Sequence, residues 1–208
     1  RPNAIEKLHA AINSIPKNQN IVGIVAYRVF ENGQISGRSF PRQKCSVGYN
    51  ELNYHFNQDG ETALIYQTEL LRAYKHKVFV DENFLSEEIQ YNELDTLGDL
   101  WLLKEPLIVM EYLEDGLTNH YFKNWLKNPK GTKLLLYSKY SAVKGLTALD
   151  VLIKKAKTLI QYDVLTMYSG RFPIQEAPNP LMAGLLFPAA VILKKRICKE
   201  NLTKWSES

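Results

Sequence analysis

The sequence contains few of the residues on which enzyme sites and disulfide scaffolds are usually built. It has two cysteines, Cys45 and Cys198, and four histidines among 208 residues. Two thiols cannot form a disulfide framework, and they are more typical of a reduced, cytoplasmic protein than of a secreted one. A single Cys45–Cys198 disulfide stays an alternative, because spacing in the sequence does not set a distance in space.

Recognisable catalytic and cofactor motifs are also lacking. Neither glycine-rich phosphate loop occurs, no two histidines have the spacing to share a metal on one helix face, and there is no Cys-x-x-Cys pair. The Gly-x-Ser-x-Gly nucleophile motif is absent as well. These absences exclude the enzymes that carry such motifs, and we predict no cofactor. Enzymes that are recognised only by the geometry of their site are not excluded.

The chain has no long hydrophobic run either. Its longest apolar and uncharged stretch, residues 177–193, contains three prolines and one glycine, whereas a bilayer span needs about 20 apolar residues. We therefore predict no transmembrane segment, and instead a buried helix with Asn179 as its cap and Pro180 at its first position. Three basic residues, 194–196, follow, so a peripheral membrane contact stays an alternative.

What the sequence does have is charge that is sorted along the chain. Residues 81–115 hold eleven of the 22 acidic residues against one basic residue, Lys104. From residue 120 to the end, fifteen Lys or Arg stand against five acids, and in residues 1–80 ten stand against six. The net charge of +4 therefore hides an acidic centre and a basic C-terminal half. Such sorting shapes an electric field, which selects partners rather than folds.

The acidic stretch, residues 81–115, is the predicted partner-binding site. Its acids follow no clear helical period, so they are not explained as the polar face of one helix. We expect a protein partner with a basic docking surface to bind there. The predicted binding residues are Asp81, Glu82, Glu87, Glu88, Glu93, Asp95 and Asp99. The alternative is that the acidic and basic blocks neutralise each other within the chain, in which case this field vanishes.

The basic half also permits a nucleic-acid-binding function. Its lysines alternate with aromatic residues, and single-stranded nucleic acid is bound by cations at the phosphates and by aromatic rings stacked on the bases. The residues concerned are Lys123, Lys127, Lys130, Lys133, Lys139 and Lys144, with Tyr121, Phe122, Trp125, Tyr137 and Tyr140. The alternative is a core of aromatics with lysines in solvent.

Two catalytic arrangements remain open. A carboxylate cluster from Asp81, Glu82, Glu87, Glu88, Asp95 and Asp99 could bind a divalent cation in a metal-dependent hydrolase. These acids obey no ligand spacing, so a solvated acidic face is the favoured explanation. A thiol, Cys45 or Cys198, could pair with a distant histidine as nucleophile and base, or could simply be an inert cysteine.

The composition and the hydrophobic patterns predict one α+β domain over residues 1–208. The apolar share of 45% and the charged share of 23% are those of a globular protein. Residues 21–40 read as a hairpin with a type I′ turn at Asn32-Gly33, which heads a small antiparallel sheet. Two helices, at residues 146–167 and 180–196, are expected to cover this sheet. The first has an apolar stripe and places Lys154, Lys155 and Lys157 on the opposite side. The stripe consists of Leu149, Leu152, Ile153, Ala156, Leu159, Ile160, Val164 and Met167.

Other segments carry weaker patterns. Residues 51–57 alternate between apolar and polar and predict a strand, and residues 61–75 predict a helix. A short strand is predicted at residues 78–80 and a short helix at residues 121–127.

The function predicted from the sequence is a non-enzymatic protein-interaction module. Opposed charge blocks, twelve tyrosines and the lack of catalytic motifs favour an adaptor, chaperone or accessory subunit of a larger assembly, of which a bacterial secretion-type assembly is one example. The nucleic-acid-binding module and the metal-dependent hydrolase are the alternatives.

Overall fold

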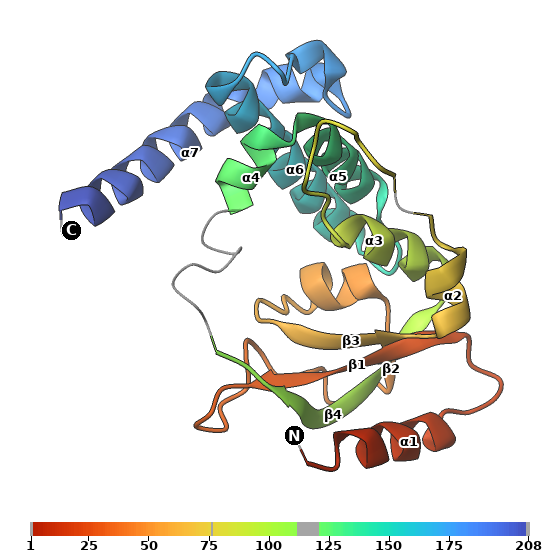
Figure 1. The fold of residues 1–208 in the computed structure, drawn as a ribbon. Helices are drawn as coiled ribbons and strands as arrows, with labels where there is room; N and C mark the ends of the chain where they lie inside the picture. The colour runs from red at the N-terminus through yellow and green to blue at the C-terminus, as the bar shows by residue number, and fades with distance from the viewer. Residues whose placement is uncertain (1, 76, 112–120, 207–208) are drawn as a thin grey trace. The chain divides into compact units, whose positions relative to one another are not determined.

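The computed structural model describes residues 2–75, 77–111 and 121–206 (Figure 1); among these, the side chains of residue 121 and of residues 196–206 are not described. The chain forms two compact units that are interleaved along the sequence, and we describe each by itself. Unit 1 comprises Arg1–Lys77, Gln90–Asn119 and Ala142–Asp150; unit 2 comprises Val78–Ile89, His120–Ser141 and Val151–Ser208. The expectation of a single domain stays a prediction.

Unit 1 is built on a four-stranded mixed sheet. Its strands are β1 (Ile21–Val29), β2 (Ser46–Val47), β3 (Thr62–Tyr66) and β4 (Asp99–Val109). Their order is β2-β4-β1-β3; β1 runs antiparallel to β3 and parallel to β4. The apolar run of β1 fits this central position, because seven of its nine residues are buried. The α+β class is confirmed, but the sheet is mixed rather than antiparallel.

Helices pack on both faces of this sheet within unit 1. On one face, Val25 and Leu102 form a cluster with Leu52 of a short π-helix, Glu51–His55. On the other face, Ala26 and Ala63 pack with Ala4 at the start of α1 (Ala4–Ser14). The remaining helices of the unit are α2 (Thr68–Ala73) and the greater part of α3 (Glu88–Leu97).

The predicted hairpin is only partly correct. The chain does reverse at Asn32-Gly33, and the amide of Phe30 donates to the carbonyl of Gln34. The side chain of Asn32, however, accepts a hydrogen bond from the Gln34 amide, and of this residue pair only Gly33 has a positive φ, so the turn is not type I′. A single bridge between Val29 and Ile35 replaces the return strand. Strand β1 pairs instead with β3 and β4, which bury more of it.

Three other predictions in this part of the chain are wrong. Residues 51–57 are not a strand: the π-helix occupies Glu51–His55 and Phe56 follows as its C-cap, and Leu52 and Phe56, four residues apart, reach the same cluster. Residues 61–75 contain strand β3 before the short helix α2, because β3 pairs with the central strand. Residues 78–80 are not a strand, and Val78 and Val80 are exposed.

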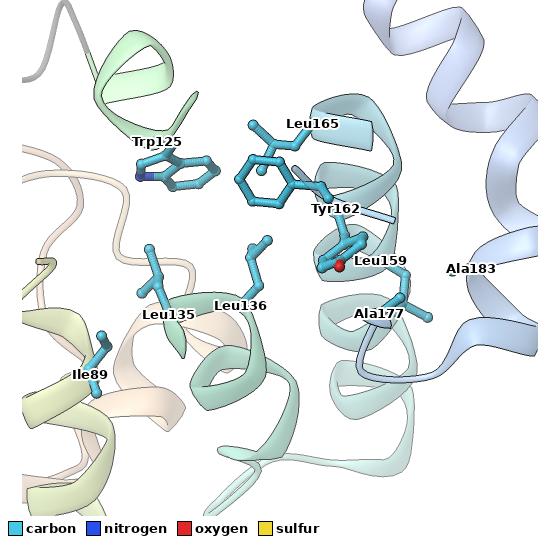
Figure 2. Close-up of a cluster of buried hydrophobic side chains, with 10 residues drawn as sticks. Ile89, Trp125, Leu135, Leu136, Leu159, Tyr162, Leu165, Ala177 and Ala183 are labelled. Carbon is cyan, nitrogen blue, oxygen red and sulfur yellow. The ribbon is translucent and has the colours of Figure 1, made fainter. Parts of the chain in front are cut away.

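Unit 2 is a helical unit with one apolar core (Figure 2). Its helices are α4 (Tyr121–Lys127), α5 (Pro129–Ser141), α6 (Ala148–Tyr168) from Val151 onward, a 3₁₀ turn at Ile174–Glu176, and α7 (Pro180–Ser206). The core joins Trp125 of α4, Leu136 of α5, Tyr162 of α6 and Ala183 of α7.

The starts of two helices in unit 2 agree with the sequence signals, whereas α7 continues to Ser206, ten residues beyond its predicted end at residue 196. Helix α4 is the helix predicted at residues 121–127. Helix α7 begins at Pro180, and the Asn179 side chain accepts a hydrogen bond from the Met182 amide at 3.1 Å, as expected for its cap. The helices predicted to cover the sheet lie almost wholly in unit 2, whereas the sheet lies in unit 1. Within the described residues, no helix has the length and apolarity needed to cross a membrane.

Candidate functional site

In unit 2, three of the predicted binding residues contact groups of the same unit. Asp81 forms an ion pair with Lys130 at 2.7 Å, and the hydrogen bond from this lysine lowers the pKa of the Asp81 carboxyl. Glu82 accepts hydrogen bonds from the amides of Lys130 and Gly131 at 2.6 and 2.7 Å. It thus caps the N-terminus of α5, where free amides and the helix dipole favour an anion. Glu88 pairs with Lys139, at 3.5 Å.

In unit 1, Asp95 and Asp99 are also engaged by neighbouring groups. The Asp95 side chain is 2% exposed, and its oxygens accept hydrogen bonds from the Tyr49 amide at 2.6 Å, the Asn50 amide at 3.2 Å and the Asn50 side chain at 2.8 Å. Asp99 pairs with Lys144 at 2.7 Å. The ammonium of Lys144 also donates to the carbonyls of Asp95 and Gly98.

Five of the seven predicted binding residues are therefore used inside their own units, as ion-pair partners or as helix caps. Glu87 and Glu93 are exposed. Glu114 and Asp115, which also belong to the acidic stretch, lie outside the described residues. The docking of a basic partner at residues 81–115 stays a prediction, with Asp81, Glu87 and Glu93 as exposed members of the predicted set.

Several of the lysines and aromatics proposed to bind nucleic acid are likewise engaged within the units. Lys130, Lys133, Lys139 and Lys144 each form an ion pair. Trp125 is buried in the core of unit 2. These groups are largely occupied, so the arrangement does not resemble a row of free cations and stacking rings.

One histidine–carboxylate pair stands out in unit 1. Asp150 Oδ2 lies 2.8 Å from His55 Nδ1 and accepts hydrogen bonds from the amide and hydroxyl of Thr147. The Thr147 hydroxyl in turn accepts from the Asp150 amide, which completes a capping box at the start of α6. The hydrogen bond from the Thr147 side chain, followed by that from His55, lowers the pKa of Asp150. The pair is thus explained as a helix cap.

The structure places the catalytic candidates as follows. Among the described residues, no group of three or more His, Cys, Asp or Glu side chains is positioned to hold a metal ion. The Cys45 thiol is free and exposed. The side chain of Cys198 lies outside the described part, so its predicted pairings stay predictions.

Helix α6 buries only part of the apolar stripe that its sequence predicts. The stripe was expected to face the core, with Lys154 in solvent. Leu159 and Val164 of the stripe are buried, and Leu159 packs with Tyr162 and Leu165 into the core of unit 2 (Figure 2). Lys154, in contrast, is 1% exposed, whereas Leu152 is 60% and Ile153 43% exposed. The N-terminal part of the predicted stripe is thereby left on the surface.

Helix α7 also leaves large aliphatic side chains in solvent. It buries Ala183 and Ala190, while Leu181, Leu185 and Ile192 are each at least 65% exposed. We define the α6–α7 surface as Leu152, Ile153, Leu181, Leu185 and Ile192. Clustered exposed aliphatics of this kind mark interaction sites, whereas a single one is ordinary.

A groove lies between the two helices at this surface. It has a volume of about 330 Å³ and is lined by Lys157, Ile160, Gln161, Ala189, Ile192 and Leu193. The α6 and α7 helices also meet nearby, where the Lys194 ammonium donates to the Met167 carbonyl at 3.3 Å. The α6–α7 surface therefore combines exposed aliphatic side chains with a concave, mostly apolar groove.

No protein family, no curated protein and no solved structure matches this chain. Its function must therefore be inferred from its own surfaces and contacts.

Proposed function

We propose that the chain is a non-enzymatic protein-interaction module that acts in the cytoplasm as an adaptor, chaperone or accessory subunit of a larger assembly. The observation that carries this proposal is the α6–α7 surface, which leaves Leu181, Leu185 and Ile192 exposed on one helix beside an apolar groove. A helix normally turns such residues toward the core.

The energetics favour covering this surface. Full burial of one leucine or isoleucine side chain stabilises by about 1.5–3 kcal/mol. The five aliphatics of the α6–α7 surface therefore offer a partner a substantial hydrophobic contribution, even after the entropic cost of association. A basic partner at the acidic stretch remains part of the proposal in a secondary role, since five of the seven carboxylates there already have partners in their own units.

The size of the complex in the native host tests this proposal. We expect the wild-type chain to elute from gentle lysates well above its own 23.9 kDa. The double variant Leu185→Glu/Ile192→Glu should elute as the free chain, because charges on these helices prevent burial. Val78→Glu is the matched control: it changes an equally exposed aliphatic of unit 2 that lies outside α6 and α7, and it should behave as wild type. Elution of the wild type as free chain, or of both variants in the large complex, would contradict the proposal.

A further inference from the structure

The shape of the α6–α7 groove is suited to one helix. On α6, Ile153 lies four residues before Lys157 and seven before Ile160; on α7, Leu185 lies four before Ala189 and seven before Ile192. Residues at these spacings share one helix face. Because the groove is lined by Ile160 and Ile192, an apolar stripe continues from it along each helix toward the N-terminus. Two such ridges with a groove between them form a binding site in which a third helix can pack.

The charge around the groove has one sign. Lys157 lines the groove and Lys195 is exposed, whereas Lys155 and Lys194 pack over the rings of Tyr140 and Tyr168. Up to residue 199, the single acidic residue on the parts of α6 and α7 within unit 2 is Asp163, which is buried; Glu200 follows on α7, eight residues after Ile192. A ligand on this surface therefore meets the cations Lys157 and Lys195 at its rim.

From these observations we propose that the groove binds one amphipathic helix of a partner protein, whose apolar stripe is flanked by aspartate or glutamate. This inference rests on the proposed function and names the partner for its site. Aliphatic side chains of the partner fill the groove, and its flanking carboxylates meet the lysines of the rim. Rim charges of this kind contribute more to association rate and selectivity than to affinity.

The same charge argument disfavours a second copy of the chain as the occupant. From residue 177 to residue 199, α7 and the segment before it contain no acid but four bases. Two copies of α7 would bring like charges together at the rim of the groove, which opposes association.

A binding assay with synthetic helices tests this inference on the full chain. The probe is a fluorescein-labelled 18-residue peptide with leucines at helical spacing and glutamates on both flanks. A second peptide carries lysines in place of the glutamates, and a third has the first one's composition in scrambled order. We expect the acidic peptide to bind at least tenfold more tightly than the other two by fluorescence anisotropy. Its affinity should also fall several-fold between 50 and 300 mM NaCl, because salt screens the rim.

Variants separate the groove from a general effect on folding. Leu185→Glu and Ile192→Glu should each lower the affinity for the acidic peptide at least tenfold, while Val78→Glu leaves this affinity unchanged. Lys157→Glu should lower the affinity for the acidic peptide and raise the affinity for the lysine peptide. A partly unfolded variant would not show such a reversal.

The alternative outcomes overturn the inference in distinguishable ways. Equal binding of the acidic and lysine peptides would overturn the stated partner chemistry. Binding of neither peptide, with a large host complex still lost in Leu185→Glu/Ile192→Glu, would overturn the helix partner while the proposed function stands. Binding of phosphatidylserine vesicles in place of the peptides, lost in the same variants, would show a membrane-binding surface instead.

Discussion

Replacement of Asp95 by alanine is expected to lower the free energy of unfolding by about 3 kcal/mol, since hydrogen bonds to a charged group contribute roughly 1.5–3 kcal/mol each. The carboxylate is buried and accepts hydrogen bonds from the amides of Tyr49 and Asn50 and from the Asn50 side chain. These amides open the helical segment that continues as the π-helix Glu51–His55. Alanine would remove the carboxylate that accepts from the Tyr49 and Asn50 amides. Urea denaturation monitored by circular dichroism measures the change.

The matched control for this substitution is Glu93→Ala. Glu93 lies on the same helix, two residues earlier, and is exposed, so we expect its loss to change stability by less than about 0.5 kcal/mol. If Asp95→Ala changed the free energy of unfolding as little as Glu93→Ala, Asp95 would not stabilise the fold and this prediction would be wrong.

Replacement of Asp163 by asparagine is expected to have the opposite effect and to stabilise the protein at neutral pH. Both carboxylate oxygens of Asp163 are buried, and within the described residues neither has a hydrogen-bond partner. Burial raises the pKa of this carboxyl from 3.8 to about 6. A shift of this size corresponds to about 3 kcal/mol of destabilisation when the group is ionised, at 1.36 kcal/mol per pKa unit. Asparagine removes the charge with little change of shape.

The direction of the pKa shift determines how the stability should change with pH. Because the folded pKa lies above the unfolded value, the folded state binds more protons between about pH 4 and pH 6. The contribution of Asp163 to stability is therefore least unfavourable below pH 4 and worsens as the pH rises through 6. The stability advantage of Asp163→Asn should be largest at pH 7–8 and should shrink toward pH 4. An advantage that does not change with pH would show that the folded-state pKa of this carboxyl is not raised, which would contradict the prediction.

The helices of unit 2 could be predicted from the sequence because their signals are local. Asn179 and Pro180 mark the start of α7, and Thr147 and Asp150 form the capping box of α6. The strand error at residues 51–57 and the helix error at residues 61–75 have different physical causes. Leu52 and Phe56 satisfy both the strand and the helix period, and the pairing of β3 with β1 depends on residues about 40 positions away.

The roles of the acidic residues could not be predicted because they depend on long-range contacts. Glu82 caps a helix that begins 47 residues later, and Asp95 caps a segment 45 residues earlier. No local pattern signals such a cap. For α6, the 3.6-residue period was correct, but only packing decides that the stripe is buried at Leu159 and Val164 and exposed at Leu152 and Ile153. The proposed site includes the exposed part of this stripe.

Photo-crosslinking in the native host tests the central claim most directly. A benzoylphenylalanine placed at Leu185 of the full chain should give, on ultraviolet irradiation, a discrete adduct with one other protein. The same probe placed at Val78 should not give this adduct. No adduct at Leu185, or the same adducts at both positions, would contradict a docking site on the α6–α7 surface.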